Sequence, residues 1–316
     1  MLTRSVWGSC LASMSVLAIV ASIRLSEPKG AAATAPAAPL PSPVAHDTLN
    51  DCCSGEPERA PAPRPGKRIL RVYADPNNLP FTNDRLEGFE NRIADLVAAE
   101  MGAELQYTWR AQRRGFFREA LKEGSADLVL AAPVGFDMAL TTAPYYRSTY
   151  VFVTRKGGPR VQSLDDESLK TLRVGVQLIG DDGTNTPPAH ALARRGIVGN
   201  LVGFLVYGDY REESPPSRIV EAVAKGDVDV AVAWGPMAGY FAKKQAVPLE
   251  VVAVSPAVDE PGLPFTFGIA MGVSRKNKPL REEIDAILIR RKADIDAILD
   301  GYGVPRVAKP QGKPKE

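Results

Sequence analysis

The stretch RILRVYADPNNLPFTNDRLEGFENRIADLVAAEMG (residues 68–102) decides the fold class of this chain. It opens with an apolar, β-branched run that ends at Asp75 before a proline, which is typical of a buried strand that stops at a turn. A loop rich in proline, asparagine and aspartate follows. Apolar residues then recur at steps of three and four over residues 89–101, which predicts a helix that Gly102 can end.

The same alternation of strand and helix continues beyond this stretch. Residues 104–109 and 126–133 read as strands, and residues 115–124 between them read as a helix. The later strand has almost no polar residue, so both of its faces are expected to be covered. Strands alternating with helices predict an α/β fold with mostly parallel sheets flanked by helices, in which ligands bind at the carboxyl ends of the strands.

A second set of strands and helices follows an extended segment at residues 147–157. After about residue 250, two extended runs lead into one long amphipathic helix over residues 277–301, which we expect to return to the first set. This arrangement predicts two lobes joined by two crossings, one near residues 152–154 and one near residues 251–254, that act as a hinge around a cleft. The predicted first lobe comprises residues 67–153 and 252–308, and the second comprises residues 154–251.

The two ends of the chain differ in composition from the lobes. Residues 1–25 resemble an export signal, with a basic residue before an apolar run, although a retained membrane anchor is the alternative. Residues 26–66 are rich in proline and alanine and predict a disordered tether, and residues 309–316 form a tail. Cys52 and Cys53 lie in the tether, either as a reactive or intermolecular pair or as two ordinary thiols. No cysteine follows them, so the lobes gain no disulfide.

The charge balance argues against nucleic acid as a partner. The 316 residues include 39 basic and 37 acidic side chains, and no basic stripe is interleaved with aromatic residues. The hydrophobic content of 45% is that of a globular protein, and beyond the signal segment no contact with a membrane is expected.

The sequence lacks the usual catalytic signatures. His46 and His190 are the only histidines, so no histidine cluster, zinc site or Ser/His/Asp triad can be assembled. Neither a GxGxxG turn after a strand, nor a P-loop, nor a GxSxG motif occurs. We expect no cofactor, no metal and no catalytic residue, and we interpret the chain as a non-enzyme. An enzyme that uses carboxylates alone, such as Glu90 or Asp209, is the alternative.

The loops predicted to face the cleft combine flat rings with amides and charged groups, which suits a binding site. The candidate residues for a ligand or partner are Asp75, Asn77, Asn78, Phe81, Glu90, Gln112, Arg113, Arg114, Pro133, Asp137, Tyr145, Tyr146, Gln177, Asp209, Tyr210 and Trp234. Other roles compete for them. Asparagine and aspartate before proline are ordinary turn formers, the two adjacent tyrosines can simply pack, and the arginines can begin a solvated helix.

Several segments resemble a known family. GFENRIADLVAAEMG, GSADLVLAAP, LRVGVQLIG and GDVDVAVAWGPMAGYF follow the order of type II periplasmic substrate-binding proteins. ADPNNLPF, YTWRAQRRGF, TTAPYYRSTYVFV, LVYGDYRE and LPFTFGIAMGV are similar to the quinoprotein-dehydrogenase-associated members, the MxaJ/XoxJ type. The resemblance covers residues 68–305 and implies a periplasmic, non-enzymatic accessory of a PQQ-dependent methanol or alcohol dehydrogenase that binds the enzyme or its cytochrome c. An import receptor for a small solute that is not an amino acid is the alternative.

The chain departs from the resemblance at three places. Amino-acid receptors of this fold hold the ligand with an arginine and an acid, where this chain has Asp137 or Met138 and Trp234. A zwitterion would therefore lose both charge partners. The associated family also commonly carries cysteines where this chain has Tyr73 and Ala126, so packing is expected to replace one bridge in the first lobe.

Overall fold

The computed structural model describes residues 66–113, 115–179, 185–206 and 208–308. All of them lie in one compact unit, Ala60–Glu316. The predicted signal segment, the tether up to residue 65 with its two cysteines, Arg114 and the tail at residues 309–316 lie outside the described residues. No helix among the described residues is both long enough and apolar enough to span a bilayer.

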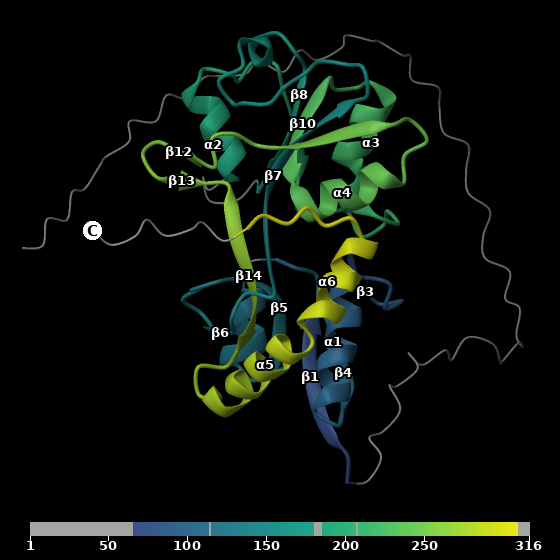
Figure 1. Cartoon of the computed structure of the whole chain (residues 1–316), viewed down its shortest axis with the longest axis vertical. Coiled ribbons are helices and arrows are strands. Elements are labelled where there is room, and N and C mark those ends of the chain that lie inside the picture. Colours follow the sequence, from purple (N-terminus) through teal and green to yellow (C-terminus); the bar gives the residue numbers. More distant parts are fainter. Residues whose placement is uncertain (1–65, 114, 180–184, 207, 309–316) are drawn as a thin grey trace, which may run out of the picture. The chain divides into compact units, whose positions relative to one another are not determined.

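A mixed sheet forms the centre of this unit (Figure 1). Its main path runs in the order β4-β1-β5-β14-β7-β10-β8-β9. Their bounds are β1 Arg68–Ala74, β4 Ala103–Trp109, β5 Leu128–Pro133, β7 Tyr146–Arg155, β8 Val174–Leu178, β9 Leu201–Leu205, β10 Val230–Trp234 and β14 Thr266–Val273. β1 pairs in parallel with β4 and β5, and β8 pairs in parallel with β9 and β10. The predicted α/β class with mostly parallel sheets is confirmed.

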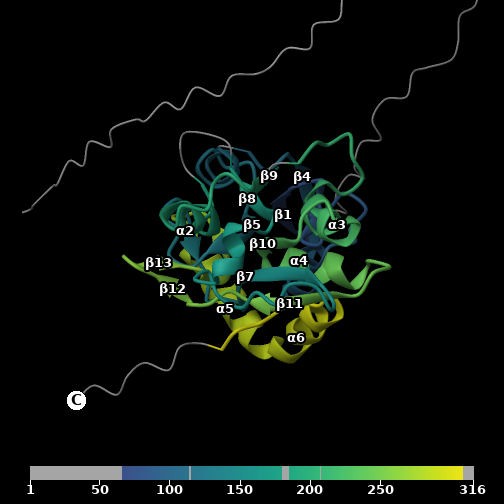
Figure 2. The same ribbon diagram turned by 90° about the horizontal axis from the view of Figure 1, so that it is seen from above.

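Helices cover both faces of the strands. They are α1 Phe89–Glu100, α2 Pro187–Arg194, α3 Arg218–Lys225, α4 Gly235–Lys243, α5 Lys278–Arg290 and α6 Lys292–Gly301, with short turns η1 Arg118–Lys122, η2 Glu167–Lys170 and η3 Pro215–Ser217. Along β10, Val230 and Val232 pack with α2, whereas Ala231 and Ala233 pack with α3 and α4. This alternation is the strand period of two, and it places α2 and α3 on opposite faces (Figure 2).

The C-terminal segment differs from the single long helix that the sequence predicts. The helix ends at Arg290, and a new one begins at Lys292. Arg291 between them has a non-helical backbone, and its guanidinium bonds Glu100 Oε1 and Asp294 Oδ2, each at 2.7 Å. The pair with Glu100 ties the break to α1, and the pair with Asp294 ties it to the first turn of α6.

Two antiparallel strands connect the predicted lobes. Residues 146–149 of β7 pair with β14, and residues 150–155 pair with β10 and with β11, Leu249–Ala253. Beyond β11, Val254 and Phe265 still pack in the apolar cluster of Phe152 and Val174. The short strands β12 Val258–Asp259 and β13 Leu263–Pro264 lie in this part of the chain. The division into lobes stays a prediction. Because of these contacts, we propose that the chain returns to the first lobe near residue 266 and not near residue 252.

The loop that follows β1 is held by an asparagine of α1. The short strands β2 Asn77–Asn78 and β3 Thr82–Asn83 pair with each other. Asn91 Oδ1 in α1 accepts hydrogen bonds from the amides of Asn83, at 3.1 Å, and Gly88, at 3.0 Å. Gly88 precedes the helix, and Phe81 O lies so close to it that a β-carbon would be only 1.9 Å away. The helix therefore begins where the loop crosses its N-terminus.

The two positions at which the associated family carries cysteines lie in one apolar cluster. Tyr73 and Ala126 pack with Phe116 and Leu121, and the rings of Tyr73 and Phe116 are 4.8 Å apart. The Tyr73 hydroxyl donates to Glu119 Oε2 at 2.9 Å. Packing and this hydrogen bond therefore hold the two positions in the same cluster.

We expect Gly88→Ala to destabilise the fold, because the new methyl group overlaps the Phe81 carbonyl, a backbone group that cannot rotate away. The expected loss is about 2–3 kcal/mol of unfolding free energy, measured by urea titration. Gly199→Ala is the control, since no atom lies within 4 Å of its β-carbon, and it should change stability by less than about 0.5 kcal/mol. Equal urea midpoints for the two variants would contradict the prediction.

Candidate functional site

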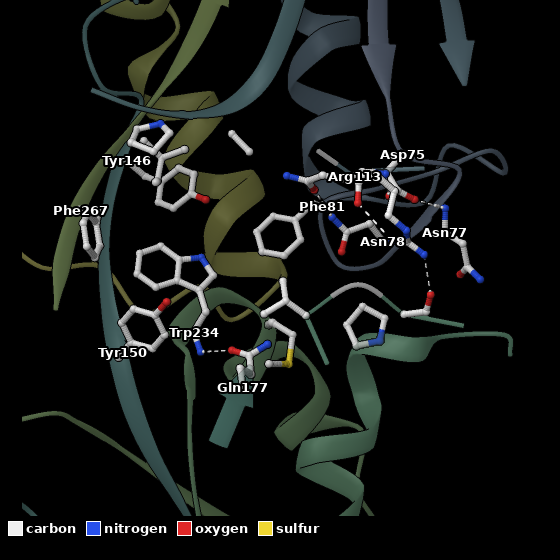
Figure 3. A pocket seen from close by; sticks show the side chains of 18 of the residues that line it. Asp75, Asn77, Asn78, Phe81, Arg113, Tyr146, Tyr150, Gln177, Trp234 and Phe267 are labelled. Atoms are coloured by element: carbon white, nitrogen blue, oxygen red, sulfur yellow. Dashed lines mark hydrogen bonds between the residues drawn. The ribbon is translucent and has the colours of Figure 1, made fainter. Parts of the chain in front are cut away.

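A cavity of about 340 Å³ lies between the carboxyl end of β1 and the ends of β8 and β10, and we call it the cleft. Eleven of the candidate residues line it: Asp75, Asn77, Asn78, Phe81, Gln112, Arg113, Pro133, Tyr146, Gln177, Tyr210 and Trp234. Figure 3 shows the polar groups, among them Asp75 and Asn77, gathered opposite the aromatic side chains. The structure brings these residues together as expected from strand ends of an α/β sheet, and their role in binding stays a prediction.

Four of the other candidates do not line the cleft. Asp137 is exposed in the turn after β5, and Asp209 pairs with Arg211, which lowers the pKa of that carboxyl to about 2. Glu90 and Tyr145 are buried beneath the cleft and bond each other. The fifth, Arg114, lies outside the described residues. Burial thus accounts for Glu90 and Tyr145, and a local ion pair accounts for Asp209, whereas Asp137 lies in an exposed turn.

Sequence reasoning missed further residues of the cleft, chiefly Tyr150, Met237, Phe267 and Ile269. Tyr150 and Phe267 belong to β7 and β14, the two strands that connect the predicted lobes. Their neighbours in sequence are largely apolar, so they read as core residues. The signal that could have found them is their position, because an aromatic residue at the middle of a crossing strand borders the space between two lobes.

The carboxylate of Asp75 organises the polar end of the cleft. Its side chain is only 4% exposed. It accepts hydrogen bonds from the Asn77 amide at 2.8 Å, from the Gln112 amide at 2.6 Å, and from the Tyr210 hydroxyl. Burial and the bond to Asp75 raise the pKa of Tyr210, so the phenol stays protonated and donates. Both oxygens of Asp75 therefore already accept hydrogen bonds from donors of the protein itself.

Residues 208–213, which we call the latch loop, cross from the second predicted lobe to this end. Besides Tyr210, the latch loop offers the Glu212 carbonyl to Asn77 Nδ2 at 2.7 Å and the Gly208 carbonyl to Arg113 Nη2 at 3.0 Å. The Arg113 guanidinium also lies 5.0 Å from the centre of the Tyr210 ring. These contacts close the polar end of the cleft.

Aromatic rings form the other end. Trp234 ends β10 and precedes α4, and its ring centre lies 5.3 Å from that of Tyr150 and 6.0 Å from that of Phe267. The Trp234 amide donates to Gln177 Oε1 at 3.0 Å, which fixes the end of β10 against β8. Gly235 follows because a β-carbon there would lie 2.5 Å from Thr149 O. Close packing of the strands thus sets the indole at the cleft wall.

A buried acid lies under the cleft. Glu90 is fully buried in the first turn of α1, and the Tyr145 hydroxyl donates to its Oε1 at 2.8 Å. Burial raises the pKa of Glu90 to about 7, although the bond from Tyr145 lowers it in part. A small cavity of about 20 Å³ is lined by both Glu90 and Asp75. No group of three or more histidine, cysteine or acidic side chains among the described residues could hold a metal ion.

The raised pKa of Glu90 makes stability depend on pH. The folded state holds the proton on Glu90 up to about pH 7, whereas the unfolded chain releases it near pH 4.5. The stabilisation that comes from this proton is therefore complete below pH 4.5 and is lost as the pH rises to 7. We expect the unfolding free energy to fall by about 3 kcal/mol over this window relative to Glu90→Gln, which cannot titrate. Urea titrations at several pH values measure this difference.

Glu260→Gln, which removes an exposed acid, is the control for the loss of one carboxyl group. The expected result is that only Glu90→Gln flattens the profile between pH 4.5 and 7. A parallel course for the wild type and Glu90→Gln across this range would show that the proton on Glu90 does not stabilise the fold.

We expect Tyr210→Phe to loosen the latch loop, because it removes one donor from the buried Asp75 carboxylate and keeps the ring beneath Arg113. The predicted cost is about 1–3 kcal/mol in urea unfolding, together with faster amide exchange at residues 208–213. Tyr240→Phe is the control, since that ring stacks on Tyr302 at 5.6 Å and keeps this contact. Unchanged exchange in Tyr210→Phe would mean that the latch loop does not depend on Asp75.

Comparisons with known proteins agree with this geometry. The model of the bacterial extracellular solute-binding proteins, family 3, matches residues 70–304. The protein MoxJ of Methylorubrum extorquens is 33% identical over 258 residues, which cover 78% of this chain and 84% of that protein. The periplasmic binding protein XoxJ of Methylobacterium extorquens AM1 is 34% identical with a TM-score of 0.62, covering 76% of this chain and all of that one. MxaJ of Methylophaga aminisulfidivorans is 25% identical with a TM-score of 0.64, covering 75% of this chain and all of that one.

Proposed function

Because the chain belongs to the bacterial extracellular solute-binding proteins of family 3, and within them to the MxaJ/XoxJ type, we propose that it is a periplasmic accessory of a PQQ-dependent methanol or alcohol dehydrogenase. It acts by binding the dehydrogenase or its cytochrome c, and it catalyses no reaction. The similarity to MoxJ, XoxJ and MxaJ over about three quarters of the chain is the observation that carries this proposal.

The charges of the cleft support a role other than amino-acid capture. Among the described residues, Asp75 and Arg113 are the charged side chains that line it. Asp75 already accepts three hydrogen bonds, and Arg113 already donates to the Gly208 and Gln112 carbonyls. Met138 is half exposed outside the cleft, and Trp234 brings a neutral indole to the place of the receptor acid. A zwitterion would have to break these bonds to gain its own.

The hydrogen bonds and ion pairs of the acidic side chains also argue against an enzyme that uses carboxylates alone. A general acid or base must reach the reacting atom within hydrogen-bond distance. Asp75 is surrounded by donors, Glu90 is buried against Tyr145, and Asp209 is paired with Arg211. None of these three presents an unengaged oxygen to the cleft in the way that proton transfer requires.

An import receptor for a small, neutral solute is the second candidate function. The observation that favours it is the cavity of about 340 Å³ with its aromatic end, a size and lining that are typical of small-molecule sites. In this case the chain would deliver its solute to a membrane transporter, and the latch loop would have to open to release it.

Capture of partners from periplasm tests the proposal. The full chain, immobilised and exposed to periplasmic extract of its own organism, should enrich the dehydrogenase or its cytochrome c over a matched solute-binding protein of the same family. Calorimetry with the twenty amino acids should detect no binding tighter than millimolar, because the cleft offers no unengaged pair of charges.

Two outcomes would contradict the accessory role. Enrichment of transporter subunits without the dehydrogenase or cytochrome would favour import. Micromolar binding of glutamate or another free amino acid would show that the engaged charges of the cleft rearrange, and it would return the chain to the amino-acid receptors.

A further inference from the structure

The aromatic end of the cleft holds more hydrogen-bond donors than acceptors. We define this end by Tyr146, Tyr150, Trp234 and Gln177. The Tyr146 hydroxyl is buried and has no partner among the described residues. Gln177 Oε1, which could accept, is already bonded by the Trp234 amide at 3.0 Å. The indole N–H and the Gln177 amide nitrogen can only donate, so this end favours an acceptor.

Tyr146 is the decisive residue because no described residue offers its hydroxyl a hydrogen bond. Its side chain is 5% exposed, and its ring lies 5.0 Å from that of Tyr145 and 5.9 Å from that of Phe89. Burial, together with the charge of Glu90, raises the pKa of Tyr146 well above 10, so the hydroxyl keeps its proton. A buried donor without an acceptor is costly, and such groups in proteins usually serve a purpose.

The hydroxyl and the indole are presented to the same space. Figure 3 shows the oxygen of Tyr146 and the nitrogen of Trp234 on the sides of their rings that face Phe81 across the cleft. The Tyr146 oxygen is buried although the residue borders the cavity, so a ligand reaches this oxygen by displacing the side chains that cover it. Ring walls on several sides favour a flat ligand that packs edge to face or offset against them.

The charge of this end limits the ligand further. Arg113 is the cation that lines the cleft among the described residues, and its bonds to Gly208 and Gln112 hold it at the polar end. An anion at the aromatic end would lose its hydration without gaining a counter-charge. A neutral hydrogen-bond acceptor loses less hydration free energy than an anion. Two or three donors of the protein can replace the hydrogen bonds that it made to water.

We propose that the aromatic end binds a flat, uncharged aromatic carbonyl compound of one or two fused rings, whose oxygen accepts hydrogen bonds from Tyr146 and Trp234. The rings of the ligand pack against Trp234, Tyr150 and Phe81, and its carbonyl points to the Tyr146 hydroxyl, which has no partner in the described part of the chain. This inference goes beyond the accessory role and does not depend on the dehydrogenase.

A pair of probes that differ in one oxygen tests it. 1-Indanone and indane have the same fused rings, but only the former carries a carbonyl. A cleft that is merely apolar should prefer indane, because the ketone gives up hydrogen bonds to water on entry. We expect the opposite, with 1-indanone bound about fivefold more tightly in calorimetry or ligand-observed NMR, as one or two neutral hydrogen bonds provide.

Tyr146→Phe removes only the hydroxyl. It should weaken 1-indanone about fivefold and leave indane within about twofold. Tyr107→Phe is the matched control, since Tyr107 lies in β4 outside the cleft, and it should change neither affinity. Because an unpartnered donor is removed, the urea midpoint of Tyr146→Phe should be equal to or above that of the wild type. Should this variant nevertheless unfold, Trp234→Phe, which removes the indole N–H, replaces it in the binding test.

The proposal is overturned if indane binds as tightly as 1-indanone, if Tyr146→Phe weakens both probes equally, or if neither probe binds up to its solubility limit. All three results leave the capture of the dehydrogenase or cytochrome untouched, because no partner protein is present in the experiment. Loss of partner capture with intact preference for 1-indanone would instead remove the accessory role and keep the ligand class.

Discussion

The carboxylate of Asp75 connects three segments that are far apart in sequence. It stands at the end of β1, and it binds the amide of Asn77 in the next turn, the amide of Gln112 after β4, and the hydroxyl of Tyr210 in the latch loop. A buried acid would be costly without such donors, so each segment is held where it can satisfy the charge. The bond from Tyr210 to this group, together with the bonds of Asn77 and Arg113 to the latch loop, closes the polar end.

The two connecting strands constrain the cleft from the other side. β7 and β14 are each part of the continuous sheet, so the rings of Tyr150 and Phe267 are fixed by backbone pairing on both sides of the space. Trp234 is in register opposite Tyr150. The aromatic end is therefore built on strands, which hold side chains more rigidly than loops do, whereas the polar end is built on loops that bond each other.

Much of this could be read from the sequence because strand and helix periods are local. The run from Arg68 to Gly102 specified a strand, a loop and a helix, and the residues at strand ends met in one cavity. The features that sequence patterns do not reveal are non-local. The bond between Glu90 and Tyr145 joins residues 55 positions apart, and the packing of Phe265 with Phe152 moved the proposed return of the chain. Such contacts depend on tertiary packing, which no periodicity reveals.

The electrostatics of the cleft also depend on the surroundings of Asp75 and Glu90. Asp75 accepts hydrogen bonds from several donors of the protein. Glu90 instead binds a proton up to about pH 7, because burial disfavours its charge. Below that pH the acid under the cleft is neutral, and the Tyr146 hydroxyl above it is neutral as well. The donors of this site are neutral and its charged groups are already bonded within the protein. Such a site discriminates against ions, because it does not replace the hydration that an ion loses on entry.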